Sequence, residues 1–148
     1  MVFPLITRFF WGDIDLRWFP EACLSHPRHR GFYTVRDFVE GQSMPGSGVL
    51  PILEWRKKKL AGEPMNGTTP LEIADALEKA SQSALTGSAP PANASTELRN
   101  TLNDIRAMGQ LARYYAAKIR SAASLALFDR SGDAAEKAEA VKQAQIAL

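Results

Sequence analysis

Three carboxylates close to two tryptophans are the residues of this sequence best suited to carry out chemistry. Asp13, Asp15 and Glu21 lie within one short stretch that also contains Trp11 and Trp18. If this stretch forms a β-strand, Asp13 and Asp15 point to the same side, roughly 6.6 Å apart along the backbone. Carboxylates at such distances transfer protons or hold hydroxyl groups in sugar sites, where aromatic faces pack against the sugar rings.

We therefore take Asp13, Asp15 and Glu21 as candidate catalytic residues. The candidate ligand-binding residues are Trp11, Trp18, Asp13 and Asp15, with a carbohydrate as the expected ligand. The alternative is structural, because a carboxylate near arginines also forms ion pairs that only hold a fold together. The arginines available for such a network are Arg8, Arg17 and Arg28.

Other residue patterns indicate no metal, cofactor or nucleic acid. Cys23, His26 and His29 have a spacing that matches no standard zinc pattern, and Pro27 prevents them from sharing one helix face. The loop at 45–48 lacks the lysine of a phosphate-binding loop. The basic run at 56–59 is expected to be a solvated helix face, because the net charge of +2 does not favour an anionic partner.

The composition allows one ordinary domain without a membrane span. The chain has 148 residues and a single cysteine, so an internal disulfide is excluded. No apolar run approaches the roughly 20 residues that cross a bilayer. The apolar stretch Met1–Phe10 contains Pro4 and Arg8 and leads into Phe-Trp, which is not a signal peptide pattern. We expect no membrane partner, and the cytoplasm is the default location.

The element that would position the candidate acids is a strand over Phe9–Phe19. Apolar and charged residues alternate along this stretch, and Gly12 is expected to form a bulge. Pro20 ends the strand. The first 55 residues contain ten of the thirteen aromatic residues, so this strand belongs to an aromatic-rich segment that is irregular elsewhere.

The element that dominates the chain is a long helix over residues 95–130. This stretch contains no proline and one glycine, Gly109, and its apolar residues recur every three or four positions. At 1.5 Å per residue the helix would be roughly 50 Å long, so shorter helices must cover its apolar stripe. The stripe consists of Leu98, Leu102, Ile105, Gly109, Ala112, Ala116, Ile119, Ala123 and Ala126.

Local start and stop signals predict the shorter helices. A capping box opens a helix at Thr34, a proline opens one at Pro51, and Thr69 with Glu72 opens a third. A last helix begins after Asp133 and runs to the final residue. The fold class is therefore mainly α, an antiparallel bundle around the long helix. We expect an aromatic-rich segment with short helices at 1–62 and a helical bundle at 63–148, with a linker loop at 86–94.

The N-terminal sequence resembles part of a known protein family. The resemblance rests on Phe10-Trp11-Gly12-Asp13-Ile14-Asp15, Trp18-Phe19-Pro20-Glu21-Ala22-Cys23, Gly31-Phe32-Tyr33-Thr34-Val35-Arg36-Asp37-Phe38 and Met44-Pro45-Gly46-Ser47-Gly48. With these residues the chain resembles the C-terminal region of large bacterial α-glucuronidase-like glycoside hydrolases. The resemblance implies that residues 9–50 follow a catalytic region and that residues 70–148 form a helical accessory domain. It implies no catalytic residue at any position here, and a barrel of about 200 residues cannot fit in this chain.

Three functions follow as expectations. The first is a helical accessory region of a glycoside-hydrolase-like protein, inactive alone and contributing Asp13, Asp15 or Trp18 to sugar binding. The second is a helical self-association module without a catalytic role, whose partner is another copy or the rest of a larger parent protein. The third is a small independent hydrolase that uses Asp13 or Glu21. No complete active site is expected, and any activity would be glycoside hydrolysis.

Overall fold

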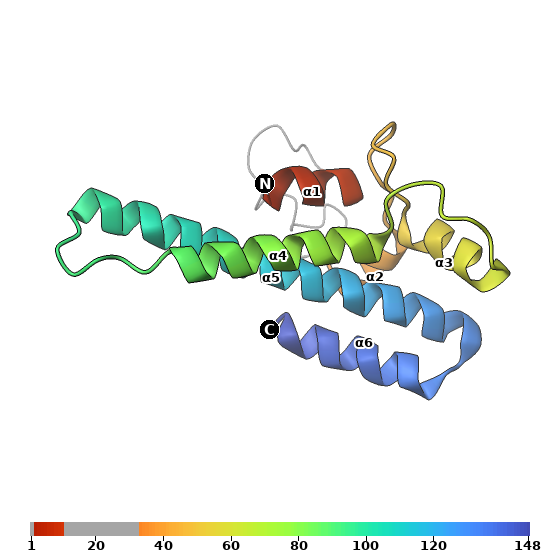
Figure 1. Cartoon of the computed structure of the whole chain (residues 1–148). Helices are drawn as coiled ribbons and strands as arrows, with labels where there is room; N and C mark the ends of the chain where they lie inside the picture. Colours follow the sequence, from red (N-terminus) through yellow and green to blue (C-terminus); the bar gives the residue numbers. More distant parts are fainter. Residues whose placement is uncertain (1, 11–32) are drawn as a thin grey trace.

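The computed structural model describes residues 2–10 and 33–148, and these residues form a mainly helical fold. These ranges contain six helices and no strand, and Figure 1 shows how the helices are arranged. The only pairing of extended backbone there is an isolated bridge between Val49 and Thr68. The antiparallel bundle that the sequence predicts is confirmed.

The centre of the bundle is α5 (Thr96–Ser131), which matches the predicted long helix within one residue at each end. Ser95 is the N-cap, and its hydroxyl accepts a hydrogen bond from the Leu98 N–H at 3.2 Å. Gly132 ends the helix with φ of 69°, a left-handed conformation that favours glycine. Ser95 and Gly132 therefore fix the two ends of the helix on which the other helices pack.

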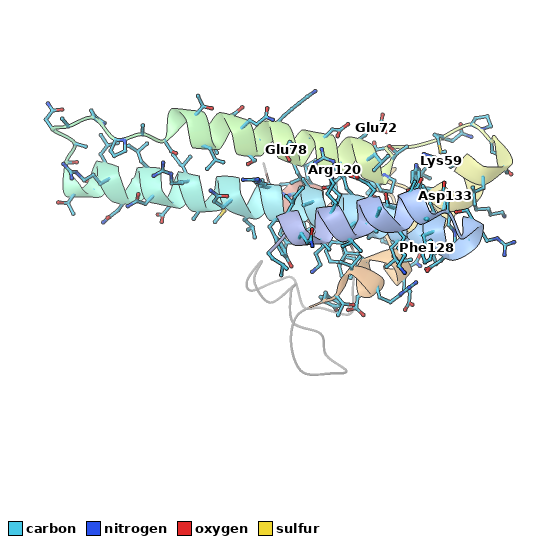
Figure 2. The ribbon with its side chains drawn as sticks, turned by 90° about the horizontal axis from the view of Figure 1, so that it is seen from below. Lys59, Glu72, Glu78, Arg120, Phe128 and Asp133 are labelled. Carbon is cyan, nitrogen blue, oxygen red and sulfur yellow. The ribbon has the colours of Figure 1, made fainter. Side chains whose placement is uncertain are left out.

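Two helices form antiparallel hairpins with α5. On one side, α4 (Pro70–Gly87) begins with the predicted capping box of Thr69 and Glu72. On the other side, α6 (Ala134–Ile146) begins at the N-cap Asp133. The prediction that this last helix reaches Leu148 is wrong, since it ends at Ile146 and Ala147 is its C-cap. Figure 2 shows α4 and α6 lying along α5, where Arg120 of α5 reaches Glu78 of α4 at 3.3 Å.

Three short helices complete the described part of the chain. They are α1 (Val2–Phe9), α2 (Val35–Glu40) and α3 (Ile52–Ala61). The predicted capping box at Thr34 is present, and Gly62 ends α3 in a left-handed conformation. Pro51 is the N-cap of α3 and therefore lies just outside the helix.

The predicted strand over Phe9–Phe19 is wrong at its first residue, because Phe9 ends α1. The rest of that prediction, from residue 11 onward, lies outside the described residues. The helix forms because Val2, Ile6 and Phe9 recur with a spacing of three to four, and all three are buried. Pro4 lies in the first turn, where a proline leaves no hydrogen bond unmade.

The core joins these short helices to the middle of α5 through an aromatic cluster. The Phe10 ring stacks on Phe38 at 4.7 Å and meets the edge of Tyr33 at 4.9 Å. Tyr115 of α5 is also stacked relative to Phe38, with the ring centroids 6.4 Å apart. Residues from both predicted segments thus share one core, and the boundary between the segments at residue 62 stays a prediction.

The expectation that helices cover the whole apolar stripe of α5 is wrong for its first third. Leu98 and Ile105 are each 41% exposed, whereas the stripe is buried from Gly109 onward. The physical reason is length. The 13 residues of α6 span about 20 Å, whereas α5 spans about 54 Å. In Figures 1 and 2 the tip of the α4–α5 hairpin lies apart from α2, α3 and α6.

Candidate functional site

The residues that the sequence suggests for a sugar site lie outside the described residues. They are Trp11, Asp13, Asp15, Trp18 and Glu21. The same holds for Cys23, His26 and His29. Their roles stay predictions. Across residues 2–10 and 33–148, no group of three histidine, cysteine or acidic residues is placed to hold a metal ion. Within those ranges, no helix combines the length and the apolar character needed to cross a membrane.

A buried lysine, Lys118, is the most unusual charged group in the described core. Its side chain is 4% exposed on α5. The ammonium group donates hydrogen bonds to the backbone carbonyl of Tyr33 and to the hydroxyl of Tyr114, the latter at 2.8 Å. It also lies over the ring of Phe38 at 4.6 Å and over that of Tyr114 at 5.1 Å. Lys118 thus ties the start of α2 to the middle of α5.

The surroundings of Lys118 perturb two titratable groups. Burial lowers the pKa of Lys118 from 10.5 to about 8, and the negative charge of Asp37 opposes this change. Burial also raises the pKa of the Tyr114 hydroxyl. An amine with a lowered pKa is a common nucleophile, but Lys118 is closed in by Phe38, Tyr33 and Tyr114. The arrangement therefore supports a structural role.

An apolar groove lies between α4 and α5 at the hairpin. It has a volume of about 630 Å³, within the range of ligand pockets. Val2, at the start of α1, also lines it. The other lining residues are Ala76, Lys79, Ala80, Ser83 and Ala84 of α4, and Thr101, Asp104, Ile105, Met108 and Gly109 of α5.

The two walls of this groove differ in side-chain size. The α4 wall is a furrow of small residues spaced four apart, Ala76, Ala80 and Ala84. The α5 wall is a ridge of larger residues, Ile105 and Met108. We call these two walls the furrow and the ridge. A furrow beside a ridge is the surface that packs well against a second helix.

Gly109 explains why α4 and α5 lie so close at the base of the groove. A Cβ atom added at this position would lie 3.0 Å from the Cβ of Ala84 and 3.2 Å from the Cγ of Leu85. Such distances are shorter than ordinary van der Waals contacts between carbon atoms. The one glycine of the long helix thus permits close approach, and it lies where the exposed third of α5 meets the buried part.

Two charges of opposite sign lie in the groove without partners. Lys79 is on the α4 wall and Asp104 is on the α5 wall. Neither one forms a hydrogen bond or an ion pair with another residue of the described ranges, whereas Glu78 and Asp75 nearby both pair with Arg120. The groove therefore has an apolar floor and one available charge of each sign.

Comparisons with known proteins give no relative for this chain. No family model, no curated protein and no solved structure matches it. The groove was not predicted from the sequence. The spacing of Ala76, Ala80 and Ala84 is a signal that could have indicated it, but small residues at helical spacing are as typical of a buried face.

Proposed function

We propose that this chain is a helical self-association module that pairs with a second copy through the α4–α5 hairpin. The observation that carries this proposal is the apolar groove at the hairpin, with a ridge directly beside a furrow. The resemblance to glycoside hydrolases supports a different role, in sugar binding. That role rests on residues 11–32, so nothing in the described ranges favours it over the module.

The first support for a second copy as the partner is shape. In a two-fold dimer the same surface meets itself, so any protrusion must face a recess of the same surface. On the α5 wall Ile105 and Met108 carry the large side chains, and on the α4 wall Ala76, Ala80 and Ala84 leave room for such side chains. A two-fold axis between them places each ridge in the partner's furrow.

The second support is charge. The same two-fold axis brings Lys79 of each copy towards Asp104 of the other, which gives two such pairs per dimer. Both side chains lack a partner within the described part of their own chain. Opposite charges at an interface fix its register and exclude wrong partners, even where they add little affinity.

The third support is the cost of exposure. Leu98 and Ile105 are each 41% exposed on the uncovered third of α5. Burial of an aliphatic side chain contributes about 1.5–3 kcal/mol when it is complete. A partner hairpin would remove these side chains from water without any rearrangement of the bundle.

The test is the mass of the particle in solution. We expect sedimentation equilibrium to give a dimer for the natural chain at about 100 µM, and a monomer for Ile105→Glu, because a buried carboxylate without a partner is costly. Val141→Glu is the matched control. Val141 is 51% exposed on α6, away from the groove, so this variant should remain dimeric.

Charge reversal tests the register. Lys79→Glu and Asp104→Lys should each weaken the dimer, and the double variant should restore it, because the opposite charges then meet again. A natural chain that is monomeric at 100 µM would refute the proposal. A dimer that persists in Ile105→Glu would place the interface elsewhere.

A further inference from the structure

A second concave surface lies at the other end of the molecule from the hairpin tip. It lies between α3 and the C-terminal end of α5, and Figure 1 shows these two helices side by side there. Its volume is about 550 Å³, which suits a small organic ligand. The residues that line it are Leu53, Arg56, Lys57, Leu60, Ala61 and Arg130.

The lining of this pocket is half cationic and contains no acidic residue. Lys57 and Arg130 form no hydrogen bond or ion pair with any residue in the described ranges. Arg56 donates one hydrogen bond to the Ala126 carbonyl at 3.2 Å, which holds its guanidinium in place and leaves its other donors available. The pocket therefore presents one positioned cation and two unpartnered cations.

The nearby acid does not neutralise these cations. Asp129 accepts two hydrogen bonds from Arg36 of α2, and the one donated by Nη2 is 3.3 Å long. These bonds, with the charges of Arg36 and Arg56, hold the pKa of Asp129 below its usual range. Since Arg36 already balances Asp129, the positive charge of Arg56, Lys57 and Arg130 remains.

Stabilisation of a helix end does not account for all of these cations. Cations in the last turn complement the helix dipole, and Lys58 and Lys59 occupy that turn of α3. Both are engaged there, since Lys58 lies 3.9 Å from Glu63 and Lys59 lies over the Trp55 ring at 5.1 Å. Lys57 lies before the last turn and faces the pocket.

We infer that this pocket binds an organic anion, a carboxylate or phosphate group attached to an apolar body. The anionic oxygens would bind Arg56, Lys57 and Arg130, because guanidinium and ammonium groups form strong hydrogen bonds with them. The apolar body would contact the aliphatic part of the lining, Leu53, Leu60 and Ala61. Leu60, which is 52% exposed, would thereby be covered.

The experiment is a titration of the ¹⁵N-labelled full chain with four probes, in which the amide chemical shifts are monitored. Probes that form micelles are used below the concentration at which they do so. Octanoate and octyl phosphate carry both features of the ligand, inorganic phosphate lacks the apolar body, and octanol lacks the charge. We expect shifts at residues 53–61 and 130 with either organic anion, at about 10-fold higher affinity than with inorganic phosphate or octanol. If only one of them binds, it identifies the anionic group.

Variants of the two unpartnered cations complete the test. Lys57→Gln and Arg130→Gln should each weaken binding about 3- to 10-fold and leave the thermal unfolding curve unchanged. Arg106→Gln is the matched control, because Arg106 is exposed on α5 far from the pocket in sequence and should not affect binding. Equal affinity of all three variants would overturn the inference. Octanol binding as tightly as octanoate, or shifts confined to residues 76–84 of the groove, would also overturn it.

Discussion

Lys118 is a charged residue in an environment that favours its neutral form. Its ammonium group lies against the face of the Phe38 ring, and it donates hydrogen bonds to a carbonyl and a hydroxyl, with no carboxylate among the acceptors. A charge that is only partly compensated in the interior raises the free energy of the folded state. The lowered pKa of Lys118 reflects this cost, so the free energy of unfolding should depend on pH.

We predict that the folded state gains stability as the pH rises from 7 to 9.5. The folded-state pKa of Lys118 is about 8 and the unfolded value is 10.5, so the unfolded chain binds more protons within this window. The destabilisation caused by the buried charge is fully present below pH 8 and disappears above the pKa of the unfolded state. Linkage gives a gain of up to about 2 kcal/mol in the free energy of unfolding between pH 7 and 9.5.

Urea unfolding at a series of pH values measures this gain. Lys118→Met should abolish it, whereas Lys142→Met, on the exposed side of α6, should retain it. The comparison must stop near pH 9.5, because the pKa of Tyr114 is raised by burial and its ionisation above pH 10 destabilises the folded state. The same pH dependence in the natural chain and in Lys118→Met would show that Lys118 is not the group responsible.

The packing of other helices on α5 changes at Gly109. Among the described helices, α4 packs along the part of α5 before this residue, whereas beyond it the short helices and α6 also pack on α5. Ala112 and Ala116 are fully buried in this second part. Small side chains are required there because several helices approach α5 at the same level.

We predict that Ala112→Leu destabilises the fold by about 1–3 kcal/mol, because three further carbon atoms overpack a closed core. For a chain of this size the melting temperature should fall by roughly 2–4 °C for each kcal/mol. Ala107→Leu is the matched control, since Ala107 is exposed on the same helix and tolerates the same change. An unchanged melting temperature for Ala112→Leu would mean that this face of α5 is not covered.

The whole molecule consists of a compact end and a projecting end. The compact end holds the aromatic cluster and the core, and the projecting end is the tip of the α4–α5 hairpin. Regions with few buried apolar contacts open more easily than the core. Local stability should therefore differ along a single helix.

We predict that, in dilute solution, the amides of residues 98–106 exchange hydrogen at least 10-fold faster than those of residues 112–127. If the chain self-associates through this tip as proposed, the protection of residues 98–106 should increase with protein concentration. Ile105→Glu should remove this increase without changing the protection of residues 112–127. Uniform exchange along α5 at every concentration would contradict both the division of the molecule and the proposed interface.

Much of the helical architecture could be read from short stretches of sequence. The capping boxes of Thr69 with Glu72 and of Thr34 with Asp37, and the glycine at 132, mark ends that the structure confirms. The reason is that these signals act between residues at most four apart, so no distant contact is needed to interpret them. Helix α1 was missed because its eight residues, with a proline in the first turn, are too few to show a helical period clearly.

Local sequence signals are sufficient to predict which residues form α5, where that helix begins and ends, and that its apolar stripe requires partners. The part of the stripe that is covered depends on where α1, α2 and α6 pack along a helix of about 54 Å, and this is visible only in the folded chain. The groove at Ala80 and Ile105 and the cationic pocket at Lys57 and Arg130 arise in the same way. Each joins residues of two helices that lie far apart in sequence, so no local pattern could place them together.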